Sequence, residues 1–381
     1  MKFILRRIAD YVRECDKVLM LLCVAATCFG CVAVLSTTYN AVGGLGQFIT
    51  QVVGMVLGIV AVIIISSFNY RKFARLWPLF AAISVGFVVL TFFIGFAPGD
   101  TDDKAWLSIF GVSFQPSELL KIAFVITFGY HVHKIGDNVK KFIHVVLLAI
   151  HGALPVLFIH FQGDDGTALV FAFMFVCMMF VAGVKRRYFI IAGSAAAVAL
   201  PFVYFLVMNE DQKNRIYSLF FPTQEDYLGV LWQQWRGRIA LANGGIFGKG
   251  LFKGPLVQAG NIPEGYNDFI FSSIGEETGL IGCIVVIALL LGICWRILRT
   301  AHLSNDKLGT TMCVGIFAMF AAQIIINIGM NLSLAPVIGV TLPLFSAGGT
   351  SLVCTFLGIG LVMSVYMHRQ SSILYLGEDN L

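Results

Sequence analysis

Apolar runs of roughly 18 residues or more, each long enough to cross a bilayer core of about 30 Å, recur along the whole chain. Of its 381 residues, 58% are hydrophobic and only 12% are charged, whereas about a quarter of the residues in soluble domains are charged. The runs do not alternate every second residue, as the strands of an outer-membrane barrel would. The sequence therefore predicts an all-α integral membrane protein.

Ten membrane helices account for these runs, and we expect a single domain over residues 1–381. A long segment, 209–268, separates the seventh and eighth helices. The first run follows several Arg and Lys residues, but it is too long for a signal peptide and has no cleavage pattern, so it is interpreted as an uncleaved span. The expected ranges are 18–36, 47–68, 74–96, 115–133, 142–161, 165–183, 188–208, 269–295, 308–333 and 345–367.

The distribution of Lys and Arg predicts the orientation of the helices. Eighteen of the 26 lie in the amino-terminal segment, in alternate short connectors and after the last helix, whereas the short connectors of the opposite side hold only Lys104. Short basic connectors remain in the cytoplasm, and long segments cross the membrane regardless of charge. Both termini are therefore predicted to be cytoplasmic and segment 209–268 to be extracellular.

Ionisable residues at the helix ends are concentrated on the predicted outer side, where such residues are costly and are candidates for function. Six acidic positions on three helices predict one shared cavity beneath the long basic segment, and Arg and Lys there suit a phosphorylated substrate. The alternative for Glu118 and Lys121 is an ion pair that only helps the helices to associate. The six acidic positions are Glu118, Asp164, Asp165, Asp268, Glu276 and Glu277.

Three other patterns are interpreted as structural. Cys28 and Cys31 lie in mid-span without a second pair, which favours helix packing over a metal or redox site. Residues 244–250 resemble a phosphate loop but lack its first Gly and its final Ser or Thr, so no nucleotide site is expected. The histidines 131, 133, 144, 151 and 160 lack a carboxylate at metal-ligand spacing, and no protein metal site is predicted from them.

Several motifs, in order and over nearly the whole chain, are similar to those of the SEDS family (shape, elongation, division and sporulation), the family of RodA-like and FtsW-like proteins. The similarity lies in Phe114–Glu118 after Trp106, Gln162–Thr167, Asn214-Arg215, Gly244–Leu251, Ile262–Phe271, Gly275–Glu277, Asn331 to Pro336 and Pro343, and Ser346–Ser351. The resemblance implies a peptidoglycan glycosyltransferase of the bacterial cytoplasmic (inner) membrane that joins lipid II units during elongation or division. It also implies a class B penicillin-binding protein (a transpeptidase) as partner, with other elongasome or divisome membrane proteins, and no nucleic acid.

Joining two lipid-linked disaccharides requires a base for the acceptor hydroxyl and cations for the departing pyrophosphate. The resemblance implies that Asp268 is the base. It implies that substrate contacts come from Gln115, Glu118, Lys121, Asp164, Arg215, Lys249 and Ser346. No cofactor is otherwise expected, and a divalent cation, Mg or Mn, is left open as a partner of the pyrophosphate.

Two functions of other classes compete with polymerisation. A lipid II flippase needs a midplane site reachable from both faces, often between broken helices, and the one-sided polar residues argue against it. A non-catalytic scaffold for the penicillin-binding protein would need no buried acids. Strand synthesis from purified lipid II distinguishes the three.

Overall fold

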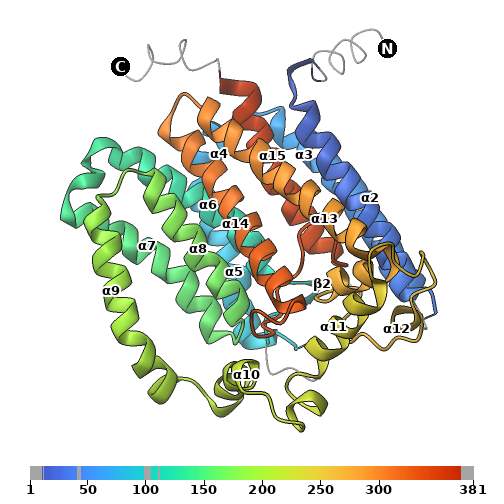
Figure 1. Ribbon diagram of the computed structural model, residues 1–381. Helices are drawn as coiled ribbons and strands as arrows, with labels where there is room; N and C mark the ends of the chain where they lie inside the picture. The colour runs from blue at the N-terminus through green and yellow to red at the C-terminus, as the bar shows by residue number, and fades with distance from the viewer. Residues whose placement is uncertain (1–10, 12, 41–43, 98–103, 110–111, 370–381) are drawn as a thin grey trace.

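Long helices packed side by side make up most of the computed structural model, which describes residues 11, 13–40, 44–97, 104–109 and 112–369. The start of α2 (Lys17–Thr38) and the end of α15 (Gly349–His368) lie at one end of the bundle (Figure 1). The short helices α10 (Glu210–Phe220), α11 (Trp232–Gly244) and α12 (Pro255–Gln258) lie at the opposite end. Segment 209–268 is therefore a partly helical cap on one end of the bundle.

The other helices are α3 (Gly44–Ser66), α4 (Tyr70–Arg75), α5 (Trp77–Ile94), α6 (Pro116–Ile135), α7 (Phe142–Phe161), α8 (Asp165–Val181), α9 (Arg186–Phe202), α13 (Ile270–Leu303) and α14 (Lys307–Asn331). Short turns of other helix types are η1 (Gly136–Lys140), η2 (Val203–Val207) and η3 (Asp226–Leu228). Two strands, β1 (Leu107–Ile109) and β2 (Val112–Phe114), form an antiparallel hairpin before α6 that the sequence analysis did not predict.

A helix occupies each of the ten predicted ranges, and eight of these helices are long and apolar enough to cross a membrane. The two that fall outside this class are α6, which carries Glu118 and Lys121, and α8, which has 17 residues. The number of ten spans therefore stays a prediction. So do the positions of the two chain ends, residues 1–10 and 370–381, which lie outside the described residues.

Two ion pairs fasten the helices at the end of the bundle away from segment 209–268. Asp16 caps the first turn of α2, and its carboxylate lies 2.6 Å from the guanidinium of Arg296 on α13. Asp306 caps α14 in the same way and lies 2.6 Å from Arg71 on α4. Each carboxylate thus satisfies an unpaired N–H of a helix start and joins two helices.

Small residues bring α3 and α15 into close contact. A Cβ added to Gly58 would lie 2.3 Å from the Phe356 ring, and one added to Gly54 would lie 3.0 Å from the carbonyl oxygen of Gly349. Gly58 has no room for a side chain, and at Gly54 the neighbouring backbone would have to shift slightly to admit one. The Gly-x-x-x-Gly spacing in α3 therefore allows the close helix approach that this spacing permits in membranes.

The helix α13 is broken at Gly279, whose φ of 69° and ψ of −166° are not helical. Segment 245–250 supplies hydrogen bonds at the break: Leu280 N–H donates to the Gly245 carbonyl at 2.9 Å, and Gly250 N–H donates to the Glu277 carbonyl at 2.9 Å. Backbone polar groups at membrane depth need such partners, because lipid offers none. Residues 244–250, which resemble a phosphate loop in sequence, thus complete the backbone of a broken helix.

Candidate active site

Asp268 lies in the turn that leads into α13, at the end of the bundle covered by segment 209–268. The residue is partly exposed. Its backbone carbonyl accepts hydrogen bonds from the side-chain amides of Asn327 and Asn331 on α14, each at 2.9 Å. Both asparagines have 0% exposure, so two buried amides fix the backbone of Asp268.

Two further carboxylates lie close enough to affect Asp268. Burial of the carboxyl group, followed by the negative charges of Glu264 and Asp164, raises the pKa of Asp268 to about 7. Glu264 itself has a positive φ of 49°, which is uncommon outside glycine. A carboxyl group with a pKa near neutral pH is suited to act as a general base.

Gln115 and Asp164, two predicted site residues, are joined directly. The Gln115 amide donates to Asp164 Oδ2 at 2.9 Å, and Asp164 Oδ1 accepts the Thr167 N–H at the start of α8. Because the negative charge of Asp164 also helps to raise the pKa of Asp268, the structure places Gln115, Asp164 and Asp268 in one neighbourhood. That neighbourhood joins the starts of α6, α8 and α13.

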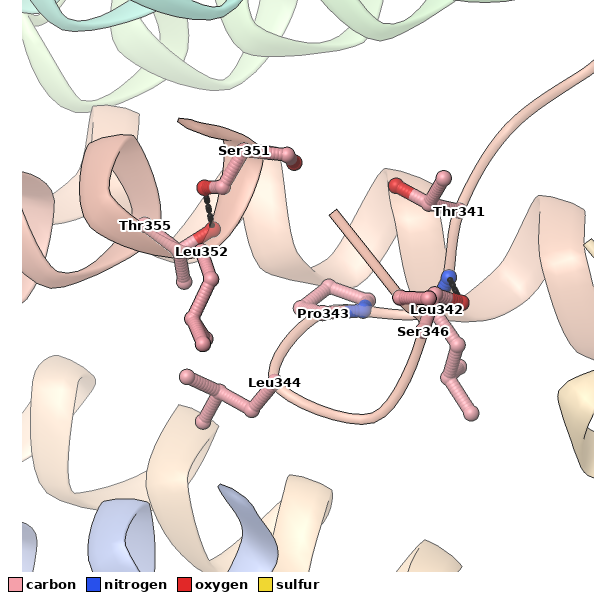
Figure 2. A pocket seen from close by; sticks show the side chains of 9 residues that line it. Thr341, Leu342, Pro343, Leu344, Ser346, Ser351, Leu352 and Thr355 are labelled. Atoms are coloured by element: carbon pink, nitrogen blue, oxygen red, sulfur yellow. Dashed lines mark hydrogen bonds between the residues drawn. The ribbon is translucent and has the colours of Figure 1, made fainter. Parts of the chain in front are cut away.

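The connector 332–348, between α14 and α15, forms another wall of the site. Ser346 Oγ donates to the Asn267 carbonyl and accepts from Leu342 N–H, both at 2.8 Å. Figure 2 shows Ser346 in a small pocket whose other labelled residues come from the same connector and the start of α15. With these two bonds inside the protein, Ser346 holds the connector against the residue that precedes Asp268.

Arg215 is an exposed residue of α10, and its guanidinium donates to the Val337 carbonyl of the connector at 3.2 Å. Lys249 is exposed as well, at the break in α13, where its backbone N–H donates to the Glu276 carbonyl at 3.0 Å. Arg215 thus contacts the connector 332–348 beside Asp268, whereas Lys249 contacts α13 close to its break at Gly279.

Glu118 and Lys121 form a buried ion pair on α6, with 2.8 Å between Nζ and Oε1 and side-chain exposures of 7% and 1%. This geometry supports the alternative interpretation of the two residues as an ion pair that helps the helices to associate. Their predicted contact with substrate stays a prediction.

Glu276 and Glu277 form hydrogen bonds with segment 209–268 and α2, and these contacts do not support the prediction of one cavity for six acidic residues. Glu276 Oε2 accepts the N–H groups of Leu256 and Val257 at the start of α12, at 3.0 and 2.8 Å. Glu277 Oε1 accepts from Ser36 on α2 at 2.7 Å and from Gln258 at 3.0 Å. Both carboxylates therefore fasten segment 209–268 to the membrane helices.

Glu276→Gln is expected to lower the thermal stability of the protein while leaving part of its activity. The substitution keeps the size of the side chain but weakens charged hydrogen bonds to buried N–H groups, which are worth about 1.5 to 3 kcal/mol each. Thermal unfolding and protease cleavage near residue 250 check this. The matched control is Glu225→Gln, at an exposed residue of the same segment. Equal stability of the two variants would contradict the structural role.

Two of the histidines are in contact: His131 and His151 lie 3.0 Å apart between their Nδ1 atoms, joining α6 to α7. In the part of the chain that the structure describes, no group of three or more His, Cys, Asp or Glu residues could hold a metal ion.

Sequence reasoning missed the roles of Asn327 and Asn331 and of Glu264. The first two lie four residues apart in a largely apolar helix, and this spacing places them on one face. Buried amides in a membrane helix are costly unless paired. That spacing was therefore the available signal, although it does not reveal the partner carbonyl of Asp268.

Comparison with known proteins identifies the family of the chain. Residues 16–371 match the family model for FtsW, RodA and SpoVE, described as cell cycle proteins. The chain is 34% identical over 364 residues to the probable peptidoglycan glycosyltransferase FtsW of Geobacter metallireducens, covering 92% of this chain and 94% of that one. It is 28% identical over 356 residues to the peptidoglycan glycosyltransferase MrdB of Escherichia coli, covering 93% and 94%.

Solved structures show the same fold. One is a chain of a peptidoglycan synthase complex, from a structure that concerns the coordination of polymerization and crosslinking. It matches with a TM-score of 0.79 and 25% identity, over 93% of this chain and 98% of that one. The rod shape determining protein RodA of Thermus thermophilus matches with a TM-score of 0.69 and 23% identity, over 93% and 97%. The chain therefore belongs to the FtsW, RodA and SpoVE family of cell cycle proteins, the SEDS family.

Proposed function

We propose that this protein is a peptidoglycan glycosyltransferase that polymerises lipid II, the disaccharide-peptide carried on undecaprenyl pyrophosphate, into glycan strands. The names of its relatives support the reaction. The observation that carries the proposal is Asp268, a partly exposed residue whose carboxyl group has its pKa raised to about 7 and whose backbone is fixed by two buried amides.

In the proposed reaction Asp268 removes the proton from the acceptor sugar hydroxyl. The resulting oxygen attacks the anomeric carbon of the donor, and the bond from that carbon to the pyrophosphate breaks. The electron pair leaves with the undecaprenyl pyrophosphate, whose charge needs cations nearby. Arg215 is the cation that the structure ties to the connector beside Asp268; Lys121, Lys249 and a divalent cation remain proposals for the same role.

Strand synthesis from purified lipid II, by the purified protein with a class B penicillin-binding protein bound, tests the function. We propose this partner as a single-pass protein whose outer domain contacts segment 209–268. Polymer formed by the complex supports the glycosyltransferase. Transfer of lipid II across a vesicle membrane without polymer would favour a flippase. If the complex shows neither activity, the scaffold function would be favoured.

We also propose that the protein lies in the bacterial cytoplasmic membrane with segment 209–268 outside. The partition of basic connectors supports this orientation, as does the position of α10–α12 at the end opposite to the ion pairs of Asp16 and Asp306. A single cysteine at position 225, in a protein freed of its nine native cysteines, is expected to react with an impermeant maleimide in intact cells. Reaction only after the cytoplasmic face is opened would reverse the orientation.

The rate of polymerisation is expected to fall about tenfold per pH unit below about pH 7, because protonated Asp268 cannot accept a proton. The charge of Glu264 helps to raise this pKa, so Glu264→Gln is expected to move the acid limb of the profile to lower pH. The measurement is the rate at saturating lipid II between pH 5 and 9. An acid limb that stays in place in Glu264→Gln would contradict the charge interaction.

A further inference from the structure

The amide of Asn331 takes the place of a backbone hydrogen bond at the start of α13. In a continuing helix, Ser272 N–H would donate to the Asp268 carbonyl, one residue before the regular bond from Ser273 N–H to the Phe269 carbonyl at 3.1 Å. Instead, Ser272 N–H donates to Asn331 Oδ1 at 3.0 Å, and Asn331 Nδ2 donates to the Asp268 carbonyl at 2.9 Å. One side-chain amide thus separates the two groups that would extend the helix.

We propose that Asn331 is a positioning residue that keeps Asp268 out of α13 and thereby aims its carboxylate into the site; the inference rests on the proposed function. Without this amide, the buried Ser272 N–H lacks a partner and the Asp268 carbonyl keeps only the Asn327 amide, so the two groups are free to bond to each other. Unpaired buried groups cost about 1 to 3 kcal/mol, which favours the extra helical bond. Helical backbone at Asp268 would turn its side chain to another direction.

Asn327 completes the clamp from one turn earlier on α14. Its Nδ2 donates both to the Asp268 carbonyl at 2.9 Å and to the Val340 carbonyl of the connector at 2.7 Å. The connector passes close to the catalytic side chain, because a Cβ added to Gly339 would lie 4.0 Å from Asp268 Oδ2. The two asparagines therefore fix Asp268 relative to the connector 332–348 as well as to α13.

Leucine has the same number of side-chain heavy atoms as asparagine but no polar group. Asn331→Leu therefore removes both the bond from Ser272 N–H and the bond to the Asp268 carbonyl. In the complex with its partner, this variant is expected to lose about 10²-fold in kcat with KM nearly unchanged, because a misplacement of about 1 Å is worth that much. Hydrogen exchange of the peptide spanning 264–274 is expected to change as well. The matched control is Gln323→Met: Gln323 is buried on the same face of α14, and its Oε1 has no hydrogen-bond partner among the residues that the structure describes.

A double mutant separates positioning from general destabilisation. In a protein that already carries Asp268→Asn, adding Asn331→Leu is expected to cause no further loss of the residual rate, since the group that it aims is gone. A further loss comparable to that in the wild-type background would overturn the proposal, as would a kcat of Asn331→Leu equal to that of Gln323→Met.

Asn331→Ser replaces Asn331→Leu if the leucine variant fails to accumulate, and the same outcomes apply to it. The wild-type complex shows separately whether the proposed function holds. If wild type makes no strands, the proposed function fails, and the exchange of peptide 264–274 still reports whether Asn331 holds Asp268. If wild type makes strands and the asparagine variant makes them equally well, only the positioning role fails.

Discussion

Asp268→Asn is expected to abolish strand synthesis, with a loss of about 10² to 10⁴ in rate, or roughly 3 to 5 kcal/mol of transition-state stabilisation. Asparagine has the size of aspartate but no basic oxygen. The two amides of Asn327 and Asn331 hold the backbone carbonyl of residue 268, not its side chain, so they are expected to remain in place. The fold and the binding of the partner should therefore survive.

Stability provides the control for this variant. The carboxylate of Asp268 is opposed by the charges of Glu264 and Asp164. Neutralising it removes that repulsion, so the melting temperature of Asp268→Asn is expected not to fall. Strand synthesis and thermal unfolding are measured on wild type and variant, each with the partner bound. If the variant keeps more than about a tenth of wild-type activity, the loss is too small for the removal of a general base, and Asp268 is not the base.

Lys121→Met is expected to destabilise the protein by about 3 to 5 kcal/mol, the cost typical of removing one partner from a buried ion pair. Lys121 has an exposure of 1%, and the variant leaves the carboxylate of Glu118 buried without its cation. The double variant Lys121→Met with Glu118→Leu removes both charges and is expected to recover most of the loss. Thermal unfolding in detergent gives the stability of all three proteins.

The opposite pattern would support the substrate contact predicted from the sequence. In that case Lys121→Met would keep the wild-type melting temperature and raise KM for lipid II, and the double variant would show no recovery. The pair of Lys213 and Glu210, in which the Glu210 side chain is 82% exposed, is the matched comparison, because ion pairs that reach solvent contribute only about 0 to 1 kcal/mol.

The positions of the helices could be predicted from sequence because burial in lipid imposes long apolar runs. The ends of the runs were less well defined: Leu76 separates α4 from α5 within one predicted helix, and α13 continues to Leu303. The break at Gly279 was not predicted, because glycine is common in membrane helices and its partner segment 245–250 is distant in sequence. Hydrogen bonding across that distance is a property of the fold.

The candidate site was predicted only in part. The resemblance identified Asp268, Asp164 and Gln115, and the structure places these three together. It also implicated Lys249, which contacts the break in α13, and sequence reasoning placed Glu276 in the same cavity, although it fastens α12. A carboxylate that bonds backbone N–H groups and one that accepts a proton from a substrate have the same sequence signal, since both are acids near the outer end of a helix.

The break in α13 also sets an order for the assembly of the protein during its synthesis. Leu280 and Ile281 donate their N–H groups to carbonyls of residues 245 and 246, which precede α13 in the chain. In the proposed orientation, that earlier segment must cross the membrane and fold back before the N–H groups at the break are satisfied. Insertion of α13 is therefore completed only after translocation of the segment before it, so a defect in translocation would leave this helix incompletely bonded in the bilayer and open to quality-control proteolysis.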